Sequence, residues 1–183
     1  MSILHPAAAA PAPQRLLHQG IVLLVGVALM TLSAKTQIPF WPVPMTLQTM
    51  AVLGFAVLAG PRMATAIMAA YLMAGATGLP VFAGSPERGL GLAYMAGPTG
   101  GYLAGFLLAS WLTGTLAQGR GLLGRSLALL AGVVAIYGCG VAWLAFFVPA
   151  DRLLAIGVLP FLLGEATKVA LVIAASALFQ RRG

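Results

Sequence analysis

Charged residues are scarce in this sequence. Only 7% of its 183 residues are Asp, Glu, Lys or Arg, and only three of these are acidic. A soluble domain carries about a quarter charged residues, so a chain with so few would expose too apolar a surface to stay dissolved. Hydrophobic residues make up 61%, and the mean hydropathy is +1.00. This composition predicts an all-α integral membrane protein, a bundle of helices embedded in lipid.

Motifs for catalysis and metal binding are also missing. The single Cys139 excludes an internal disulfide and a cysteine metal cluster, and His5 and His18 are too isolated to predict a metal site. The sequence contains no GxxxxGKS/T phosphate loop, no GxSxG and no HExxH. Its basic residues do not form the cluster that a nucleic-acid-binding surface needs. We therefore expect no enzyme or ATPase activity, no cofactor and no nucleic-acid partner.

Six apolar segments are candidates to cross the bilayer. They cover residues 16–34, 46–59, 63–78, 99–117, 127–148 and 159–179. The second and third are shorter than the usual span of about 20 residues, and only residues 60–62 join them, which predicts a tight turn. Gly157 and Pro160 predict a break before the sixth segment. We expect a flexible tail over residues 1–14 and a single transmembrane domain over residues 15–183.

The basic residues predict the orientation of this domain. Six crossings place both termini on one side, together with Arg15, Arg62, Arg120, Arg125, Arg181 and Arg182. The other side has Lys35, Arg88 and Arg152, beside Glu87 and Asp151. By the positive-inside rule both termini are cytoplasmic, and the protein is a multi-pass protein of the plasma membrane. The long loops 35–45 and 80–98 then face outward, so we expect a binding site that opens outward.

The first outward loop has a composition that suits a lid over a small ligand. Pro39, Pro42 and Pro44 fix an extended and largely rigid path. Phe40 and Trp41 add flat apolar surface beside these prolines. An alternative role for the aromatic pair is an anchor at the membrane interface, where Trp is enriched. The sequence leaves both interpretations open.

Hydroxyl groups and small residues mark the end of the second outward loop. Thr99 and Tyr102 place two hydroxyls at the predicted start of the fourth helix, among glycines that allow close approach. Small residues then recur every four positions, at Gly97, Gly101, Gly105, Ala109 and Thr113. This spacing favours close helix packing inside the protein, although such a surface can also face a partner subunit.

The sixth segment holds the only two full charges found in any of the apolar segments, Glu165 and Lys168. Their burial is costly unless each finds a partner. Three residues apart on a helix, they lie on one face. One interpretation is an ion pair that locks the bundle. The other is a ligand site in which the carboxylate accepts N–H bonds and the ammonium donates to an oxygen, and the frequent functional use of intramembrane charges favours it.

Four stretches of the chain carry a family resemblance. They read IPFWPVPMTLQT at 38–49, GLPVFAG at 78–84, GPTGGYLAGF at 97–106 and GEATK at 164–168. In order and spacing they resemble the BioY family, the substrate-binding S components of energy-coupling factor (ECF) transporters for the vitamin biotin. The resemblance covers the chain after its N-terminal tail. It implies a six-helix S-component fold with long structured external loops, which binds biotin from outside with high affinity.

The resemblance also implies roles for particular residues. An acidic residue and a lysine three positions later contact the biotin head in the family, and this motif maps onto Glu165 and Lys168, with Glu where many members have Asp. The remaining substrate contacts that we expect are Thr99 and the aromatic residues Tyr102, Phe82, Trp41 and Tyr94. The prolines and Phe40 of the first outward loop are expected to form the lid.

The implied partners are biotin, the lipid bilayer, a transmembrane coupling subunit and two cytoplasmic ATPases. The first helix departs from the family, because it lacks the alanine-x-x-x-alanine surface with which S components commonly dock, and we expect docking either to use a looser small surface around Gly20, Gly26 and Ala28 or to differ in this protein. An alternative function is an autonomous ion- or proton-coupled transporter of a small molecule, which would form its path as a homo-oligomer. Recognisable internal repeats would favour that alternative, and none is evident in the sequence.

Overall fold

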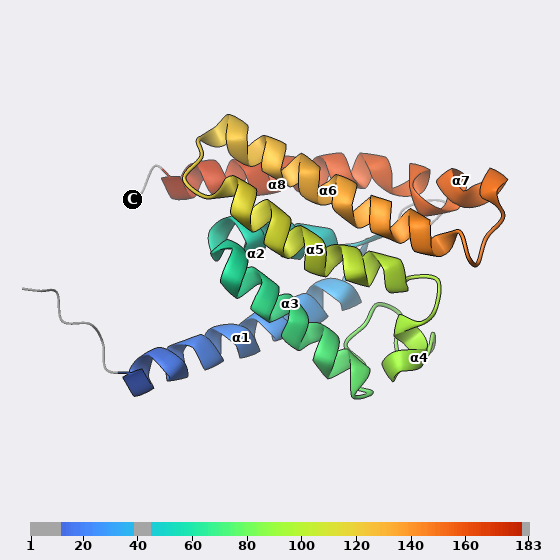
Figure 1. Cartoon of the computed structure of the whole chain (residues 1–183), viewed down its shortest axis with the longest axis horizontal. Coiled ribbons are helices and arrows are strands. Elements are labelled where there is room, and N and C mark those ends of the chain that lie inside the picture. The colour runs from blue at the N-terminus through green and yellow to red at the C-terminus, as the bar shows by residue number, and fades with distance from the viewer. Residues whose placement is uncertain (1–11, 39–44, 181–183) are drawn as a thin grey trace, which may run out of the picture.

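The structure, a computed structural model, describes residues 12–38 and 45–180. Its elements are α1 (Ala12–Lys35), β1 (Gln37–Ile38), β2 (Met45–Thr46), α2 (Gln48–Leu58), α3 (Gly60–Ala76), α4 (Gly91–Met95), α5 (Gly100–Ala117), α6 (Leu122–Leu144), η1 (Ala150–Arg152), α7 (Leu153–Gly157), η2 (Leu159–Phe161) and α8 (Leu162–Gln180). The α2–α3 and α5–α6 connections and the C-terminal end of α8 lie at the left of Figure 1, which we call the terminal end. Helices α4 and α7 lie at the opposite, loop end.

Helix length and composition agree with a membrane protein. Three stretches are long and apolar enough to cross a bilayer, namely Gln14–Lys35, Leu122–Leu144 and Ala150–Leu178. Helix α2 is apolar but shorter. Large hydrophobic side chains are exposed along the outer surfaces of α1, α6 and α8, where lipid rather than water would meet them. The predicted helical, membrane-embedded architecture is therefore confirmed, while the number of crossings does not follow from helix length alone.

Three local predictions can be compared with the backbone. The break before the sixth segment is confirmed, because α7 ends at Gly157, Pro160 lies in η2 and α8 begins at Leu162. The tight turn is shorter than predicted, since Gly60 already begins α3 at φ +78° and Pro61 occupies its first turn. The all-α expectation needs a small correction, because β1 and β2 pair antiparallel and close the first outward loop.

Small residues bring α5 and α6 into close contact. A Cβ atom added at Gly105 would lie 2.8 Å from the Cα atom of Ile136. Ala109 and Thr113 are fully buried in the same helix, and the Thr113 hydroxyl donates to the carbonyl oxygen of Ala128 at 3.2 Å. The small-residue spacing therefore serves internal packing, as predicted from the sequence.

A buried aromatic cluster fixes the segment between α3 and α5 to the bundle. The fully buried Phe82 stacks on Tyr94, with ring centroids 4.8 Å apart, and meets the edge of Tyr71 at 5.5 Å. The Tyr71 hydroxyl donates to the carbonyl oxygen of Val81 at 2.9 Å. This cluster fixes the position of residues 77–99, which join α3 to α5 and which we call the outward segment.

Candidate functional site

The loop end contains a cavity of about 330 Å³. That volume falls within the range of about 300–1,000 Å³ in which small ligands bind. Its walls come from the start of α2, the segment between α3 and α5, the facing ends of α5 and α6, and the stretch from α7 into α8. These elements run to the right in Figure 1. The cavity therefore joins parts of the chain that are far apart in sequence.

Glu165 and Lys168 form a buried ion pair on the wall of this cavity, and each residue is only 4% exposed. Both lie near the start of α8, and the Lys168 ammonium donates to Oε1 of Glu165. The Thr49 hydroxyl donates to the same oxygen at 2.8 Å and accepts from Nζ of Lys168 at 2.6 Å. Nζ also donates to the carbonyl oxygen of Thr46 at 3.2 Å. The chain from β2 into α2 thus stabilises both charges.

The two charged groups differ in what they leave for a ligand. A lysine ammonium has three donors, and those of Lys168 meet acceptors on Glu165, Thr49 and Thr46. The Oε2 atom of Glu165, in contrast, is buried and has no hydrogen-bond partner among the described residues. An unpaired buried polar atom costs about 1–3 kcal/mol, and more when it is charged. An N–H or O–H donor that reached Oε2 would therefore be stabilising.

Aromatic side chains form the apolar part of the cavity. Tyr102 and Tyr137 meet edge to face at 6.1 Å, and the Tyr102 hydroxyl donates to the carbonyl oxygen of Gly157 at 2.8 Å. The Tyr94 hydroxyl donates to the carbonyl oxygen of Ala83 at 2.7 Å. Burial raises the pKa of the Tyr94 phenol, so this group is neutral at physiological pH. Further apolar lining comes from Leu103, Phe106, Ile136 and Leu144.

The structure places most of the predicted ligand contacts around this cavity. Glu165, Lys168, Tyr102, Thr99 and Tyr94 line it. Phe82 is not among the lining residues, because its ring is buried in the cluster with Tyr71 and Tyr94. Trp41 and the lid residues Pro39, Phe40, Pro42 and Pro44 lie outside the described residues. For all of them, direct contact with a ligand stays a prediction.

Five lining residues with polar side chains were not predicted. They are Thr46, Gln48, Thr49, Arg88 and Tyr137. Thr46, Gln48 and Thr49 lie in the stretch 38–49, one of the four that carry the family resemblance, and this position could have marked them as candidates. Arg88 had been assigned to the outward side by its charge, but nothing in its sequence neighbours indicated a ligand. Tyr137 lies within an apolar segment and gave no signal at all.

These observations define a class of protein. A helical membrane protein that holds a cavity beside a buried, incompletely hydrogen-bonded ion pair has the features of a membrane-embedded protein that binds a small polar molecule.

The chain belongs to the BioY family, which it matches over residues 8–183. It is 38% identical over 144 residues to a probable biotin transporter BioY of Pyrococcus horikoshii, with 79% of this chain and 85% of the relative covered. It is 40% identical over 150 residues to the biotin transporter BioY of Thermotoga maritima, with 81% and 86% covered. The family resemblance identified in the sequence is therefore confirmed.

A solved structure shares the fold. The crystal structure of an S-component for biotin from an ECF-type ABC transporter superimposes with a TM-score of 0.78 and 25% sequence identity, and the match covers 96% of both chains. The predicted S-component architecture is thus supported over nearly the whole chain.

Proposed function

We propose that this protein binds biotin with high affinity and takes it up across the plasma membrane as the S component of an ECF-type transporter. The observation that carries the proposal is the buried Glu165 carboxylate of the cavity wall, whose Oε2 atom has no hydrogen-bond donor among the described residues. Membership of the BioY family and the names of the relatives support biotin as the ligand.

The chemistry of biotin complements this cavity. Its ureido ring has two N–H donors and one carbonyl acceptor, and a thioether ring is fused to it. One ureido N–H satisfies Oε2 of Glu165. The fused rings pack against Tyr102 and Tyr137, which offer aromatic surface on the same wall.

The ureido carbonyl is the expected partner of Lys168. Because all three donors of this ammonium already have acceptors, the ligand must replace one of them. The bond to the Thr46 carbonyl oxygen is the easiest to replace, because it is long, at 3.2 Å, and its acceptor is uncharged. We expect Lys168 to exchange this bond for the biotin carbonyl while its contacts with Thr49 and Glu165 persist.

Arg88 is the expected partner of the biotin carboxylate. It lines the cavity from the outward segment, and its side chain is exposed rather than buried. A guanidinium in this position can bind a carboxylate with paired hydrogen bonds while the valerate chain extends toward the opening. The ligand would then be held by charge at its acid group and by the buried ion pair at its head.

The topology and partners belong to the same proposal. The six apolar segments and the arginine distribution support six crossings with both termini cytoplasmic, and the match to an S-component of an ECF-type ABC transporter supports coupling to a transmembrane subunit and ATPases. In α1, a Cβ atom at Gly26 would lie 2.7 Å from the Ile67 side chain, so this glycine packs against α3. Gly20 faces open space and Ala28 is exposed, so these two residues are the ones of the expected docking surface that a partner can reach.

Binding can be tested on the purified protein. We expect mass spectrometry to find co-purifying biotin and a titration without ATP to show tight, saturable binding. Lys168→Ala leaves a buried carboxylate unpaired, which can cost about 3–5 kcal/mol of stability. The double variant Glu165→Gln/Lys168→Met removes both charges together, and Arg152→Gln is a control on the same end outside the cavity. Normal binding by the double variant would disprove the assignment of the site.

Uptake separates the proposal from an autonomous carrier. Cells that express the protein together with an energy-coupling module should lose biotin uptake when ATP is depleted. Uptake that instead collapses with the proton gradient and ignores ATP depletion would support the ion- or proton-coupled alternative.

A further inference from the structure

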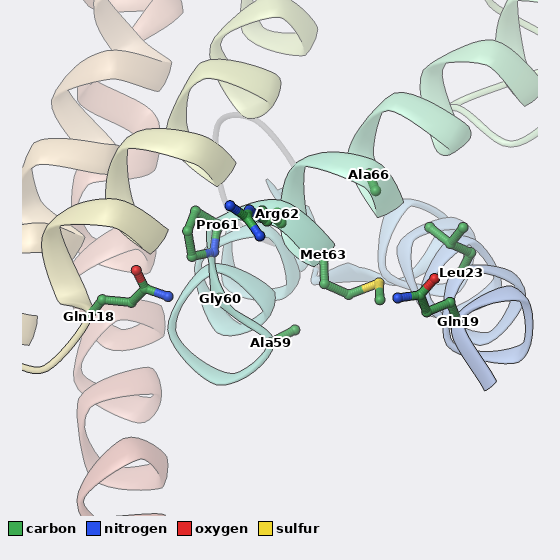
Figure 2. A pocket seen from close by; sticks show the side chains of 9 residues that line it. All are labelled: Gln19, Leu23, Ala59, Gly60, Pro61, Arg62, Met63, Ala66 and Gln118. Atoms are coloured by element: carbon green, nitrogen blue, oxygen red, sulfur yellow. The ribbon is translucent and has the colours of Figure 1, made fainter. Parts of the chain in front are cut away.

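A second cavity lies at the terminal end, far along the bundle from the ligand cavity. Its volume is about 580 Å³, and its walls come from α1, the α2–α3 junction and the end of α5. Figure 2 shows Gln118 on one side, Arg62 and Pro61 in the middle, and Gln19 on the far side, where Met63 extends toward it. This cavity is therefore formed by three parts of the chain and is separate from the proposed biotin site.

Three polar side chains line this cavity and have no partner among residues 12–38 and 45–180. Arg62, Gln19 and Gln118 are exposed, and none makes a side-chain hydrogen bond or ion pair with another described residue. A guanidinium has five N–H donors, and each amide adds two more. No carboxylate lies among the lining residues. This donor-rich set is suited to an anion with several acceptor oxygens.

An anion bound at this cavity would have to come from outside the chain, because no acidic side chain lies near it. The three acidic residues are Glu87, Asp151 and Glu165. Glu87 precedes α4 and Asp151 precedes α7, so both belong to the loop end, and Glu165 is paired in the ligand cavity. The terminal end therefore has no acidic side chain to neutralise Arg62.

The apolar part of the cavity favours a lipid over a soluble anion. Leu23, Met63, Pro61 and Ala66 line it beside the polar groups. Leu16, Leu24 and other large hydrophobic side chains are exposed on α1 around the same region, where acyl chains would lie. Basic pockets between helices at a membrane surface commonly bind anionic headgroups. We propose that this cavity binds the phosphate headgroup of an anionic phospholipid from the leaflet that surrounds the terminal end, with Arg62, Gln19 and Gln118 as donors.

Native mass spectrometry with defined lipids can test the site. The purified protein would be titrated with phosphatidylglycerol and with phosphatidylcholine of the same acyl chains. We expect at least one phosphatidylglycerol to be retained preferentially, and Arg62→Gln to reduce that preference about fivefold. Gln118→Leu should also weaken retention although it removes no charge. Arg120→Gln removes the same charge at the same end outside the cavity, so it should leave the preference unchanged.

Several outcomes would overturn the proposal. Equal retention of the two lipids by the unmodified protein would exclude a headgroup site. An equal loss in Arg62→Gln and Arg120→Gln would indicate diffuse surface charge. Displacement by inorganic phosphate at matched concentration would indicate a free anion. Unchanged lipid retention in Arg62→Gln, with loss of assembly with a membrane subunit, would indicate a protein partner. No biotin is added in any arm and no residue of the ligand cavity is changed, so the result is independent of the proposed function.

Discussion

Thr49 provides a quantitative test of how the buried ion pair is held. Its hydroxyl donates to Oε1 of Glu165 at 2.8 Å and accepts from Nζ of Lys168 at 2.6 Å. The substitution Thr49→Val keeps the shape of the side chain but removes both bonds. A hydrogen bond to a charged group contributes about 1.5–3 kcal/mol. If one such contribution is lost from the bound state, the affinity for biotin should fall roughly tenfold to hundredfold.

The assay is a biotin titration of the detergent-purified protein by calorimetry. Thr49→Ser retains the hydroxyl and serves as the matched control, with an affinity expected within about threefold of the parent protein. A thermal unfolding scan of each variant without ligand separates loss of fold from loss of binding. Should Thr49→Val bind biotin as tightly as Thr49→Ser, the hydroxyl would not position the charged pair, and our account of the site would be wrong.

Three further substitutions address other parts of the site. Arg88→Gln should weaken the binding of biotin but not of its methyl ester, because the ester has no carboxylate to pair; equal losses for both ligands in parallel titrations would contradict this role. Gly140→Ala should displace the adjacent tyrosine ring and lower affinity severalfold, whereas Gly138→Ala, with open space at its Cβ, should not; calorimetry on both variants makes the comparison. The Lys35 ammonium donates to the carbonyl oxygen and the hydroxyl of Ser85, and so ties α1 to the segment between α3 and α5. Lys35→Met removes both bonds and should speed amide hydrogen exchange in that segment. Unchanged exchange would show that these bonds do not hold the segment in place.

The charged pair is the part of the site that sequence alone could predict. A glutamate and a lysine three residues apart in an apolar helix need each other and lie on one face, whatever surrounds them. The positions of Gly105 and Thr113 were equally predictable, because small residues spaced four apart give a helix one narrow surface. Both inferences depend on spacing along a single helix, and that is why they required no knowledge of the fold.

The contributions from other elements could not be predicted in this way. Thr49 is 116 residues from Glu165, and only the packing of α2 beside α8 brings them together. A threonine can equally turn its hydroxyl back onto its own helix, as Thr31 does with the carbonyl oxygen of Val27. Phe82 illustrates the same difficulty. An aromatic residue in an outward loop can contact a ligand or pack in a core cluster, and Phe82 packs against Tyr71 and Tyr94. Such choices are decided by tertiary packing.

The hydrogen bonding of the pair favours a ligand site over a structural lock. A lock that only joined helices would be best served by protein donors on both carboxylate oxygens, because hydrocarbon offers none. Here Oε1 of Glu165 receives bonds from both Thr49 and Lys168, whereas Oε2 receives none among the described residues. The missing hydrogen bond thus concerns one oxygen of Glu165, a residue that lines a cavity large enough for a small molecule. Since an unpaired charged oxygen is destabilising in the empty protein, a ligand whose N–H group reaches this oxygen should be bound more tightly.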